Sequence, residues 1–534
     1  MILFNSDIVS LNRDTAFEFV EDGNSRTFML DLVTGLVLSV NDMTLLIVKI
    51  LSAADEISFG NLVKNLSADL GENFFAIKDI NDLLINLYAY DFILIKRASS
   101  KTILLINPNY PFINRFSNPT PPLGLLLLGT QLSNHGYNVE IIDMPAINAS
   151  ESDIISILSE YEPDYIGISL IFSMCHDIVI NLTELIKNKY CNKVPIILGG
   201  NHATFMAKEL MVCKSIDVIV KYQGVHTFLY LINSLVENGY KKDVLTQYDN
   251  LLFRVGDEII DTGTKNTMYD INSIPLFDWN LIKPNNYMKD DRWILYTSIG
   301  CTNACHYCST SQFNGAGRVN SMSVETMINH IKNIKLYALD QDKIQISFVD
   351  DAFTFSYERT EKFCLELIEQ NINIIWGCSS RVDHLDEKLV RLMYKAGCKA
   401  IFFGVESCND KVLKKANKKT SNESAQSIVK ICKDVGIITT VAFILGLPGE
   451  DMTVVDLITN YINHVEPKNV NLSILKIYPG TRYWNNPERY GLKVLNRTLN
   501  TIETFEPMTE TSELNRNQLL QAYIKIKAMS QKTE

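Results

Sequence analysis

Two long stretches of the chain switch regularly between the apolar runs of buried strands and the spacing of amphipathic helices. In the first stretch, residues 101–240, short apolar runs alternate with helical patterns such as 122–135 and 174–189. Strands separated by helices build doubly wound parallel sheets, whose ligands bind beyond the carboxyl ends of the strands. We therefore predict a Rossmann-like domain over 101–240, with strands at 103–107, 139–143, 165–169, 194–198 and 218–220.

The second stretch, residues 290–485, repeats the same alternation six times and predicts a partial (β/α)6 barrel. Functional side chains of such barrels gather at the carboxyl ends of the strands. The expected strands are 293–299, 344–349, 372–378, 400–406, 439–445 and 469–477, and the expected helices are 323–338, 358–370, 386–396, 422–435 and 451–464.

The first 97 residues have a different pattern, which predicts a small winged-helix-like domain. Two β-type runs flank Thr34-Gly35, a hairpin turn signal, and Asn41 suits the N-cap of a following helix. The expected elements are strands at 28–33, 36–40 and 92–95 and helices at 43–51, 59–70 and 77–90. We assign residues 241–289 to a linker and residues 486–534 to a C-terminal segment with a helix at 513–532. The predicted fold class is α/β.

Composition and charge exclude several classes of protein. The chain has 534 residues, is 46% hydrophobic and 21% charged, and carries a net charge of −11. Because no Lys/Arg stripe appears, we expect no nucleic-acid partner. The longest apolar stretch, 123–128, is too short for a membrane span, and the first residues lack the features of a signal peptide. Eleven cysteines, most of them isolated, favour reduced thiols and a cytoplasmic location.

The strongest chemical signal is Cys301-Thr-Asn-Ala-Cys305-His-Tyr-Cys308, directly after the first expected barrel strand. Three thiolates can hold three irons of a [4Fe–4S] cluster and leave the fourth iron open. A structural zinc site would need a fourth ligand and usually CxxC pairs, and no second such pair exists. The spacing, with Tyr307 before the last cysteine, resembles the radical S-adenosylmethionine (radical SAM) signature, in which the open iron binds the amino and carboxylate groups of S-adenosylmethionine.

The expected barrel strands end in side chains that suit this cofactor. Its amino-acid head needs a carboxylate for the ammonium and a cation for the carboxylate. The resemblance assigns the ammonium to Asp350 or Asp351, the carboxylate to Arg381 or Ser379, and a polar part of the adenosyl group to Glu406. Gly446 and Gly449 would leave room beside the adenine. No residue is singled out as a catalytic acid, base or nucleophile.

The expected Rossmann-like domain resembles the cobalamin-binding domain that precedes many radical SAM domains. The resemblance rests on Pro121-Pro-Leu-Gly124, on Gly136 to Asp143, and on Gly199-Gly-Asn-His-Ala-Thr204. Residues 107–111 contain no DxHxxG motif, so no motif histidine is expected on the cobalt, and 221–226 lacks the usual Gly-Glu-rich turn. A degenerate domain without cofactor is the alternative. The corrinoid-binding residues implied are Ser169, Gly199, Gly200, His202 and Thr204.

The N-terminal pattern Leu30-Asp-Leu-Val-Thr-Gly35, followed by Asn41 and helices, resembles the PqqD-like recognition element of enzymes that modify ribosomal peptides. That module binds a leader peptide as an added strand, which we place at the edge near 28–33. A plain winged helix that binds DNA is the alternative, and the scarcity of Lys and Arg in this segment disfavours it.

These resemblances imply a radical SAM enzyme that modifies a ribosomal peptide, by C-methylation from cobalamin through a 5′-deoxyadenosyl radical. Its cofactors would be a [4Fe–4S] cluster, S-adenosylmethionine and cobalamin, and its partners a precursor peptide and an electron donor such as flavodoxin or ferredoxin. A peptide epimerase or thioether/carbon cross-linking enzyme with a vestigial cobalamin domain is the main alternative. A non-catalytic leader or corrinoid carrier and a tRNA-modifying enzyme are further alternatives.

Overall fold

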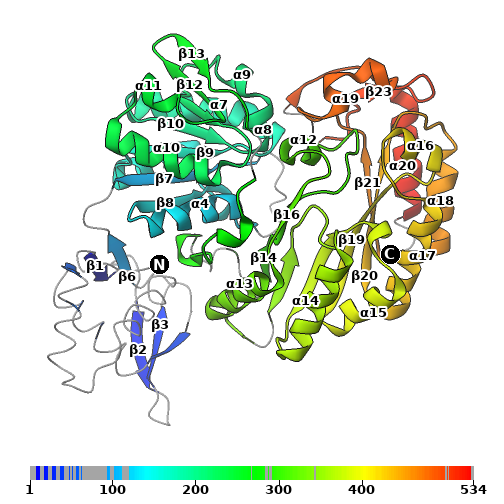
Figure 1. Cartoon of the computed structure of the whole chain (residues 1–534), viewed down its shortest axis with the longest axis horizontal. Coiled ribbons are helices and arrows are strands. Elements are labelled where there is room, and N and C mark those ends of the chain that lie inside the picture. The colour runs from blue at the N-terminus through cyan, green and yellow to red at the C-terminus, as the bar shows by residue number, and fades with distance from the viewer. Residues whose placement is uncertain are drawn as a thin grey trace. The chain divides into compact units, whose positions relative to one another are not determined.

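Figure 1 shows the computed structural model of the chain, which describes most of residues 101–530 and parts of residues 1–100. Before residue 101 it describes six short strands and positions 47, 51 and 62. After residue 100 it leaves out 111–118, 266–267, 283–286, 288–291, 342–343, 500–501, 503 and 531–534. The chain divides into two compact units. The first is Met1–Asn107, Pro121–Gly167 and Pro275–Lys289, and the second is Pro108–Thr120, Ile168–Ile274 and Asp290–Glu534.

The N-terminal strands form two antiparallel sheets with the orders β5-β1-β6 and β2-β3-β4. The predicted hairpin is confirmed, because β3 pairs with β4 and Thr27 lies opposite Val40. β2 pairs with the other side of β3, so the edge near 28–33 predicted to accept a peptide is already occupied. The three predicted helices lie almost entirely outside the described residues. The strands are β1 Ile8–Leu11, β2 Phe17–Glu21, β3 Thr27–Asp31, β4 Val37–Val40, β5 Glu56–Ser58 and β6 Ile93–Lys96.

The predicted doubly wound sheet is confirmed as the parallel part of a seven-stranded sheet with the order β13-β12-β11-β10-β9-β7-β8. Its first strand, β7, is an apolar run that is almost entirely buried. The strand order reverses between β7 and β9, which is where doubly wound sheets bind ligands. The parallel strands are β7 Thr102–Asn107, β8 Asn138–Asp143, β9 Tyr165–Ser169, β10 Ile196–Gly199 and β11 Val218–Val220, and the longer helices are α4 Leu123–Asn134, α6 Glu151–Tyr161, α7 His176–Lys189 and α10 Gly224–Asn238.

The beginning of the predicted linker is part of this sheet. β12, Leu251–Val255, runs antiparallel to β11, and β13, Glu258–Asp261, returns beside β12. The sequence signal for this hairpin is Gly256-Asp257 between two apolar runs. The linker assignment was therefore wrong for these residues, because the hairpin supplies ladder hydrogen bonds to an otherwise open edge of the sheet.

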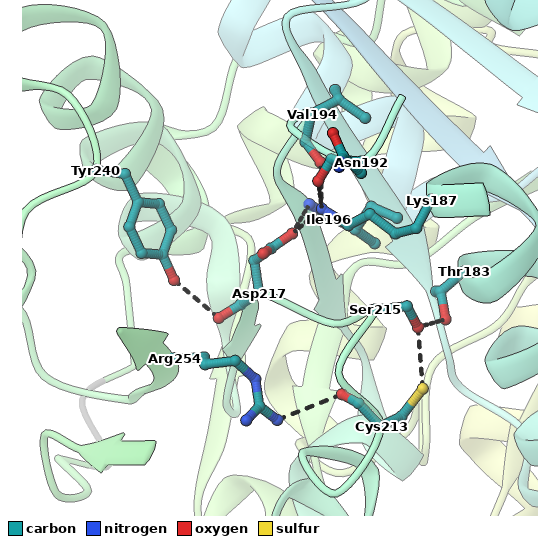
Figure 2. Close-up of polar contacts among 10 residues, drawn as sticks. All are labelled: Thr183, Lys187, Asn192, Val194, Ile196, Cys213, Ser215, Asp217, Tyr240 and Arg254. Carbon is teal, nitrogen blue, oxygen red and sulfur yellow. Dashed lines mark hydrogen bonds and ion pairs between the residues drawn. The ribbon is translucent and has the colours of Figure 1, made fainter. Parts of the chain in front are cut away.

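Polar contacts shown in Figure 2 hold the amino ends of β10 and β11 together. The carboxylate of Asp217 accepts hydrogen bonds from the Lys187 ammonium and the Ile196 backbone N–H, each at 2.7 Å. The Tyr240 hydroxyl donates to the Asp217 carbonyl oxygen at 2.9 Å. Since these contacts lie at the end of the strands away from the expected ligand site, we interpret them as structural.

The predicted partial barrel is confirmed by a sheet with the order β14-β17-β18-β19-β20-β21, in which neighbouring strands are parallel. Residues that face the helices, such as Trp376, Phe403 and Phe443, are buried. The strands are β14 Arg292–Leu295, β17 Gln345–Phe348, β18 Ile375–Ser380, β19 Cys398–Glu406, β20 Ile438–Leu445 and β21 Asn469–Ile474, and the helices between them are α13 Val324–Tyr337, α14 Tyr357–Glu369, α15 Glu387–Lys395, α17 Asn422–Val435 and α18 Val454–Val465.

The opposite face of the barrel strands is open. Ser347, Phe402, Asn471 and Ser473 alternate with the buried positions and are exposed. Complete barrels of this kind fill their interior with side chains. The exposed inner positions therefore indicate that this partial barrel has room for ligands.

Short elements surround the two sheets and carry most of the loops discussed below. No helix in the described part of the chain is both long and apolar enough to cross a membrane. The short elements are α5 Met144–Ile147, η1 Ser173–Cys175, α8 Asn201–Phe205, α9 Ala207–Leu210, α11 Lys242–Leu245, η2 Ile271–Ser273, η3 Trp279–Ile282, β15 Ser298–Gly300, α12 Thr310–Asn314, β16 Val319–Ser321, η5 Val382–His384, α16 Asp410–Lys415, α19 Arg482–Asn485, η6 Pro487–Tyr490, β22 Lys493–Val494 and β23 Thr509–Glu510, followed by the longer α20 Arg516–Ser530.

The turn after β20 is built around the buried carboxyl group of Glu450. It accepts hydrogen bonds from the backbone N–H groups of Gly446 and Leu447, at 2.9 and 3.2 Å, and from the Ser407 hydroxyl at 2.8 Å. Burial raises the pKa of Glu450 to about 7, although these hydrogen bonds act in the opposite direction. The folded protein therefore holds a proton at Glu450 in a pH range where the unfolded chain has lost it.

We predict that Glu450→Gln changes how stability depends on pH. A folded-state pKa above the unfolded value gives wild-type stability that is present below pH 4.5 and is lost as pH rises through about 7. Gln cannot ionise, and its amide oxygen can still accept from the Gly446 and Leu447 N–H groups. The free energy of unfolding of the variant, relative to that of the wild type, should therefore rise by about 3 kcal/mol between pH 4.5 and 8. Denaturant unfolding at several pH values measures this, and a constant difference would contradict it.

Candidate functional site

The three motif cysteines lie in a loop that other segments of the second unit hold in place. Cys305 is buried, whereas Cys301 and Cys308 are partly buried. The Asn417 side-chain amide donates to the Ala304 carbonyl oxygen at 2.7 Å. The backbone N–H of His306 donates to the Ala416 carbonyl oxygen at 3.0 Å, and that of Tyr483 donates to the His306 carbonyl oxygen at 3.3 Å. The loop is thus fixed by residues far away in the sequence.

Burial disfavours the ionised form of two of the three motif thiols. Burial raises the pKa of Cys301, and it raises the pKa of Cys308 to about 11. A coordinating metal overcomes such a shift and keeps the thiol deprotonated. No three His, Cys, Asp or Glu side chains of the described residues converge as they would on a single metal ion. A cubane cluster spaces its cysteine sulfurs more widely than a single ion does, so this finding concerns a single ion and not a cluster.

Asp350 and Asp351 have different surroundings. Asp350 is buried, and its carboxylate accepts three hydrogen bonds of 2.6 Å from the Thr297 N–H, the Thr297 hydroxyl and the Ser298 hydroxyl. Asp351 is exposed and accepts from the Gly300 N–H and the Thr310 hydroxyl, both at 2.9 Å. Asp350 therefore fixes the strand that leads to the cluster loop, and only Asp351 offers its carboxylate to a ligand.

Arg381 brings a buried cation to the cluster loop. One guanidinium nitrogen donates to the Asp383 carboxylate at 2.9 Å and to the Lys419 carbonyl oxygen at 3.0 Å. Nε is buried and has no hydrogen-bond partner in the described structure. The guanidinium also interacts electrostatically with Cys301 and Cys305. Because buried donors are nearly always paired, the free Nε–H marks a place where a ligand carboxylate would fit. Ser379, its neighbour in β18, is partly exposed.

Glu406 ends β19 in a strained conformation beside Tyr307. Its φ of 68° lies in the left-handed region, which a residue other than glycine rarely adopts. Its carboxylate forms a buried ion pair with Lys418 at 3.1 Å. Burial raises the pKa of Tyr307, and the negative charge of Glu406 raises it further. Strain of this kind persists where the surrounding structure enforces it, often at functional sites.

The two glycines after β20 lie in a turn that requires positive φ angles. Gly446 and Gly449 have φ values of 88° and 92°, so the turn itself requires glycine. A Cβ atom at Gly446 would lie 3.0 Å from Leu519, and one at Gly449 would lie 2.6 Å from the Lys415 ammonium. The turn and these close contacts are reasons for glycine that do not depend on a ligand, and the predicted place beside an adenine stays a prediction.

A cavity of about 250 Å³ opens beside the cluster loop on the inner side of β20 and β21. Its walls combine aromatic and aliphatic groups with polar groups and the cation Lys476, and the apolar and polar groups suit an adenosyl group next to Tyr307. The lining residues include Tyr307, Ile444, Asn471, Ser473, Tyr478 and Phe505.

The loop after β10 is held by contacts within the protein. Gly200 has a φ of 110°, and a Cβ atom there would lie 2.7 Å from the Leu170 carbonyl oxygen. The Thr204 hydroxyl donates to the Gly200 carbonyl oxygen at 2.9 Å and accepts from the Tyr222 N–H at 2.8 Å. Gly199 is partly exposed. Both contacts of the Thr204 side chain therefore position the loop, and its predicted role in corrinoid binding stays a prediction.

Both ring nitrogens of His202 contact other side chains of the protein. Its Nδ1 lies 2.9 Å from the Ser173 hydroxyl, and its Nε2 lies 2.9 Å from Nδ1 of His176. Burial lowers the pKa of His202 to about 3, so it is neutral at physiological pH. Its predicted contact with a corrinoid stays a prediction. The sequence could not reveal the pairing, because His176 comes from a different helix.

Two apolar residues after β9 were missed by the sequence analysis. Ile171 and Phe172 directly follow Leu170 and are 46% and 43% exposed. The Phe172 ring makes an edge-to-face contact with Tyr110, whose centroid is 5.2 Å away. The detectable signal was an apolar run that continues beyond Ser169, itself partly exposed at the end of the strand. Ile171 and Phe172 together form an apolar surface that suits a corrin ring.

Within the second unit, the loops after β10 and β11 contact the helix that follows the cluster loop. The Asn201 amide donates to the Ser309 hydroxyl at 3.2 Å, and the Gln223 amide donates to the Asn314 side-chain oxygen at 2.5 Å. The Phe313 ring of α12 lies 6.2 Å from Phe205, measured between ring centroids. Ser309 directly follows Cys308, so the two candidate cofactor sites are joined by direct contacts.

Comparison with known proteins agrees with this geometry. The Radical SAM superfamily matches residues 295–459, and the B12 binding domain matches residues 111–232. The chain is 28% identical over 433 residues to the uncharacterized methyltransferase PH0819 of Pyrococcus horikoshii, covering 79% of this chain and 92% of that protein. It is 26% identical over 394 residues to the cytidylyl-2-hydroxyethylphosphonate methyltransferase of Streptomyces wedmorensis, covering 65% and 73%.

Solved structures share the fold at low identity. The cobalamin-dependent S-adenosylmethionine radical enzyme OxsB with aqua-cobalamin bound has a TM-score of 0.66 at 16% identity, over 97% of this chain and 75% of that one. The radical S-adenosylmethionine methyltransferase TsrM from Kitasatospora setae has a TM-score of 0.64 at 16% identity, over 80% and 89%. The chain thus carries a B12-binding domain and a radical SAM domain, whose cofactors are cobalamin and a [4Fe–4S] cluster with S-adenosylmethionine.

Proposed function

We propose that this protein is a cobalamin-dependent radical SAM methyltransferase that methylates a carbon atom of a ribosomally synthesised peptide. The observation that carries the proposal is the contact between the loops after β10 and β11 and α12, because methyl transfer needs both cofactors to reach one acceptor. When bound, the cluster with S-adenosylmethionine supplies a 5′-deoxyadenosyl radical, and the corrinoid supplies a methyl group.

In this proposal, the residues around the cluster loop bind and orient S-adenosylmethionine. Asp351 attracts the ammonium of S-adenosylmethionine, and the free Nε–H of Arg381 donates to its carboxylate. The Glu406–Lys418 pair holds the end of β19, and the cavity that Tyr307 lines would hold the adenosyl group. No side chain is assigned as a proton donor or acceptor.

The peptide substrate is supported by the N-terminal sheet rather than by the barrel. Of the two strands in the predicted hairpin, β3 is paired with β2 on its other side, and no described strand pairs with the outer edge of β4. An edge strand presents unpaired N–H and C=O groups that an extended peptide can join. We therefore place the leader peptide along β4.

A peptide epimerase or cross-linking enzyme remains the second candidate. It would use the same cluster and S-adenosylmethionine site but no methyl donor. The exposed apolar surface of Ile171 and Phe172 favours methylation, because an enzyme without corrinoid has no evident use for it. Dependence of turnover on corrinoid separates the two candidates.

The cluster assignment predicts that replacing Cys301, Cys305 and Cys308 together with Ala removes the iron. Wild-type protein reconstituted without oxygen should hold close to four irons per chain, the content of one [4Fe–4S] cluster. The triple variant should lose the iron and all cleavage of S-adenosylmethionine. Cys191→Ala, at a partly exposed thiol of the B12-binding domain, is the control. Iron retained by the triple variant would refute the assignment.

The corrinoid assignment predicts that Ile171→Asp and Phe172→Asp each reduce corrinoid retention at least about tenfold. A carboxylate covered by an apolar ring loses its hydration, and about 1.4 kcal/mol is enough for that factor. Corrinoid absorbance after reconstitution and desalting measures it. The matched control is Val212→Asp, at a 78% exposed position of the same domain. Equal retention in all variants would place the corrinoid elsewhere.

The leader assignment predicts that one of two adjacent proline substitutions in β4, Leu38→Pro or Ser39→Pro, weakens peptide binding without unfolding the sheet. Adjacent N–H groups of an edge strand point alternately to the partner strand and to the free edge, and proline removes one of them. Binding of a labelled precursor peptide encoded beside the gene is the readout, with cleavage of S-adenosylmethionine unchanged. Full binding in both variants would exclude this edge.

A further inference from the structure

Cationic residues gather around the cluster loop, although the whole chain has a net charge of −11. Residues 411–419 and 482–490 contain seven Lys or Arg and one Glu. Both segments contact the loop, because His306 bonds to Ala416 through its N–H and to Tyr483 through its carbonyl oxygen. Val412 and Ala416 also share one hydrophobic cluster with Tyr483, so the two segments form one continuous wall beside the loop.

Most of this positive charge has no carboxylate partner. Lys418 is the exception, since it is buried in the ion pair with Glu406. Lys411, Lys414 and Arg489 are exposed and Arg482 is half-buried, and none of the four forms an ion pair with a described residue. Elsewhere in the second unit, exposed cations often have such partners, as in Lys242–Glu258, Lys388–Glu361 and Arg391–Glu387. We call Lys411, Lys414, Arg482 and Arg489 the basic surface.

The basic surface surrounds a short aromatic contact that begins inside the cluster loop. The His306 ring lies 4.7 Å from the Tyr490 ring and 5.9 Å from the Tyr483 ring, measured between centroids. Arg482 directly precedes Tyr483 and Arg489 directly precedes Tyr490, so both arginines are next to rings that contact the loop. The basic surface therefore lies near the three cysteines.

We propose that the basic surface docks an acidic protein that carries a low-potential one-electron centre, of the flavodoxin type. The proposal rests on the proposed function, because only a chain that holds the cluster needs such a partner. The anionic flavin hydroquinone of the carrier gives up one electron and becomes the neutral semiquinone, so no proton has to move. The electron enters the cluster, which passes from [4Fe–4S]²⁺ to [4Fe–4S]⁺.

Charge complementarity is the reason for choosing an acidic carrier. Opposite charges on two protein surfaces speed their association and orient it, and salt screens this attraction. An electron acceptor near a basic rim is reached fastest by a donor with an acidic rim. The remainder of this chain, with its overall negative charge, would repel such a carrier and so disfavour other docking positions.

The test compares two reductants on the reconstituted full-length protein. The variant Arg482→Glu/Arg489→Glu reverses two charges of the basic surface, and Lys411→Glu/Lys414→Glu reverses the other two on a different helix. The control Lys362→Glu/Lys395→Glu makes the same change in net charge at exposed, unpaired positions of α14 and α15. Figure 1 shows these helices at the end of the second unit away from α16 and α19.

Reduction of the cluster is followed by its EPR signal and by the semiquinone absorbance of an added flavodoxin. With flavodoxin hydroquinone at low salt, both basic-surface variants should react at least about tenfold more slowly than wild type, and the control should match wild type. High salt should slow the wild type towards the variants. Dithionite, which needs no docking, should reduce all proteins equally.

Two outcomes would overturn the docking proposal. One is an unchanged flavodoxin-driven rate in both basic-surface variants. The other is an equal loss with dithionite, which would mean that these residues support the cluster itself. A wild-type protein that holds no reducible cluster would instead refute the proposed function, so the two failures are distinguishable.

Discussion

The buried carboxylate of Asp350 is the constraint on which the radical SAM site depends. It draws together the end of β14 and the beginning of β15 through three short hydrogen bonds to Thr297 and Ser298. Arg359 adds a hydrogen bond to the Thr297 hydroxyl at 2.7 Å and lies close enough to act on the charge of Asp350. Burying a charge without such partners is strongly unfavourable. The carboxylate thus fixes the strand from which the three cysteines follow.

The remaining groups of the site are connected to this fixed point by short segments of chain and direct hydrogen bonds. Asp351 is the next residue and stays exposed, and Gly300 donates to it just before Cys301. Beyond Cys308, α12 contacts the loops of the B12-binding domain through Ser309 and Asn314. The positions of both candidate cofactor sites in the second unit therefore depend on one short segment. On its other side, the same segment contacts the wall that carries the basic surface.

Local patterns in the sequence predicted the elements well, but not the partners of individual side chains. Cysteine spacing identified the cluster loop, and strand–helix alternation predicted both parallel sheets, because these are properties of contiguous residues. Contacts across the fold determine the rest: His202 pairs with His176, Thr204 accepts a hydrogen bond from Tyr222, and β2 pairs with β3. Gly446 and Gly449 show a further limit, since the sequence marks a glycine but not whether a turn or a ligand requires it.

In the reaction that we propose, radical chemistry and a corrinoid methyl donor act on one peptide. The decisive experiment follows a labelled methyl group from methylcobalamin, together with 5′-deoxyadenosine, in protein reconstituted with and without corrinoid. We expect the label to appear in the peptide only with corrinoid and in step with 5′-deoxyadenosine. Full turnover without corrinoid, giving a peptide of unchanged mass or one that has lost two hydrogens, would contradict it and indicate an epimerase or a cross-linking enzyme.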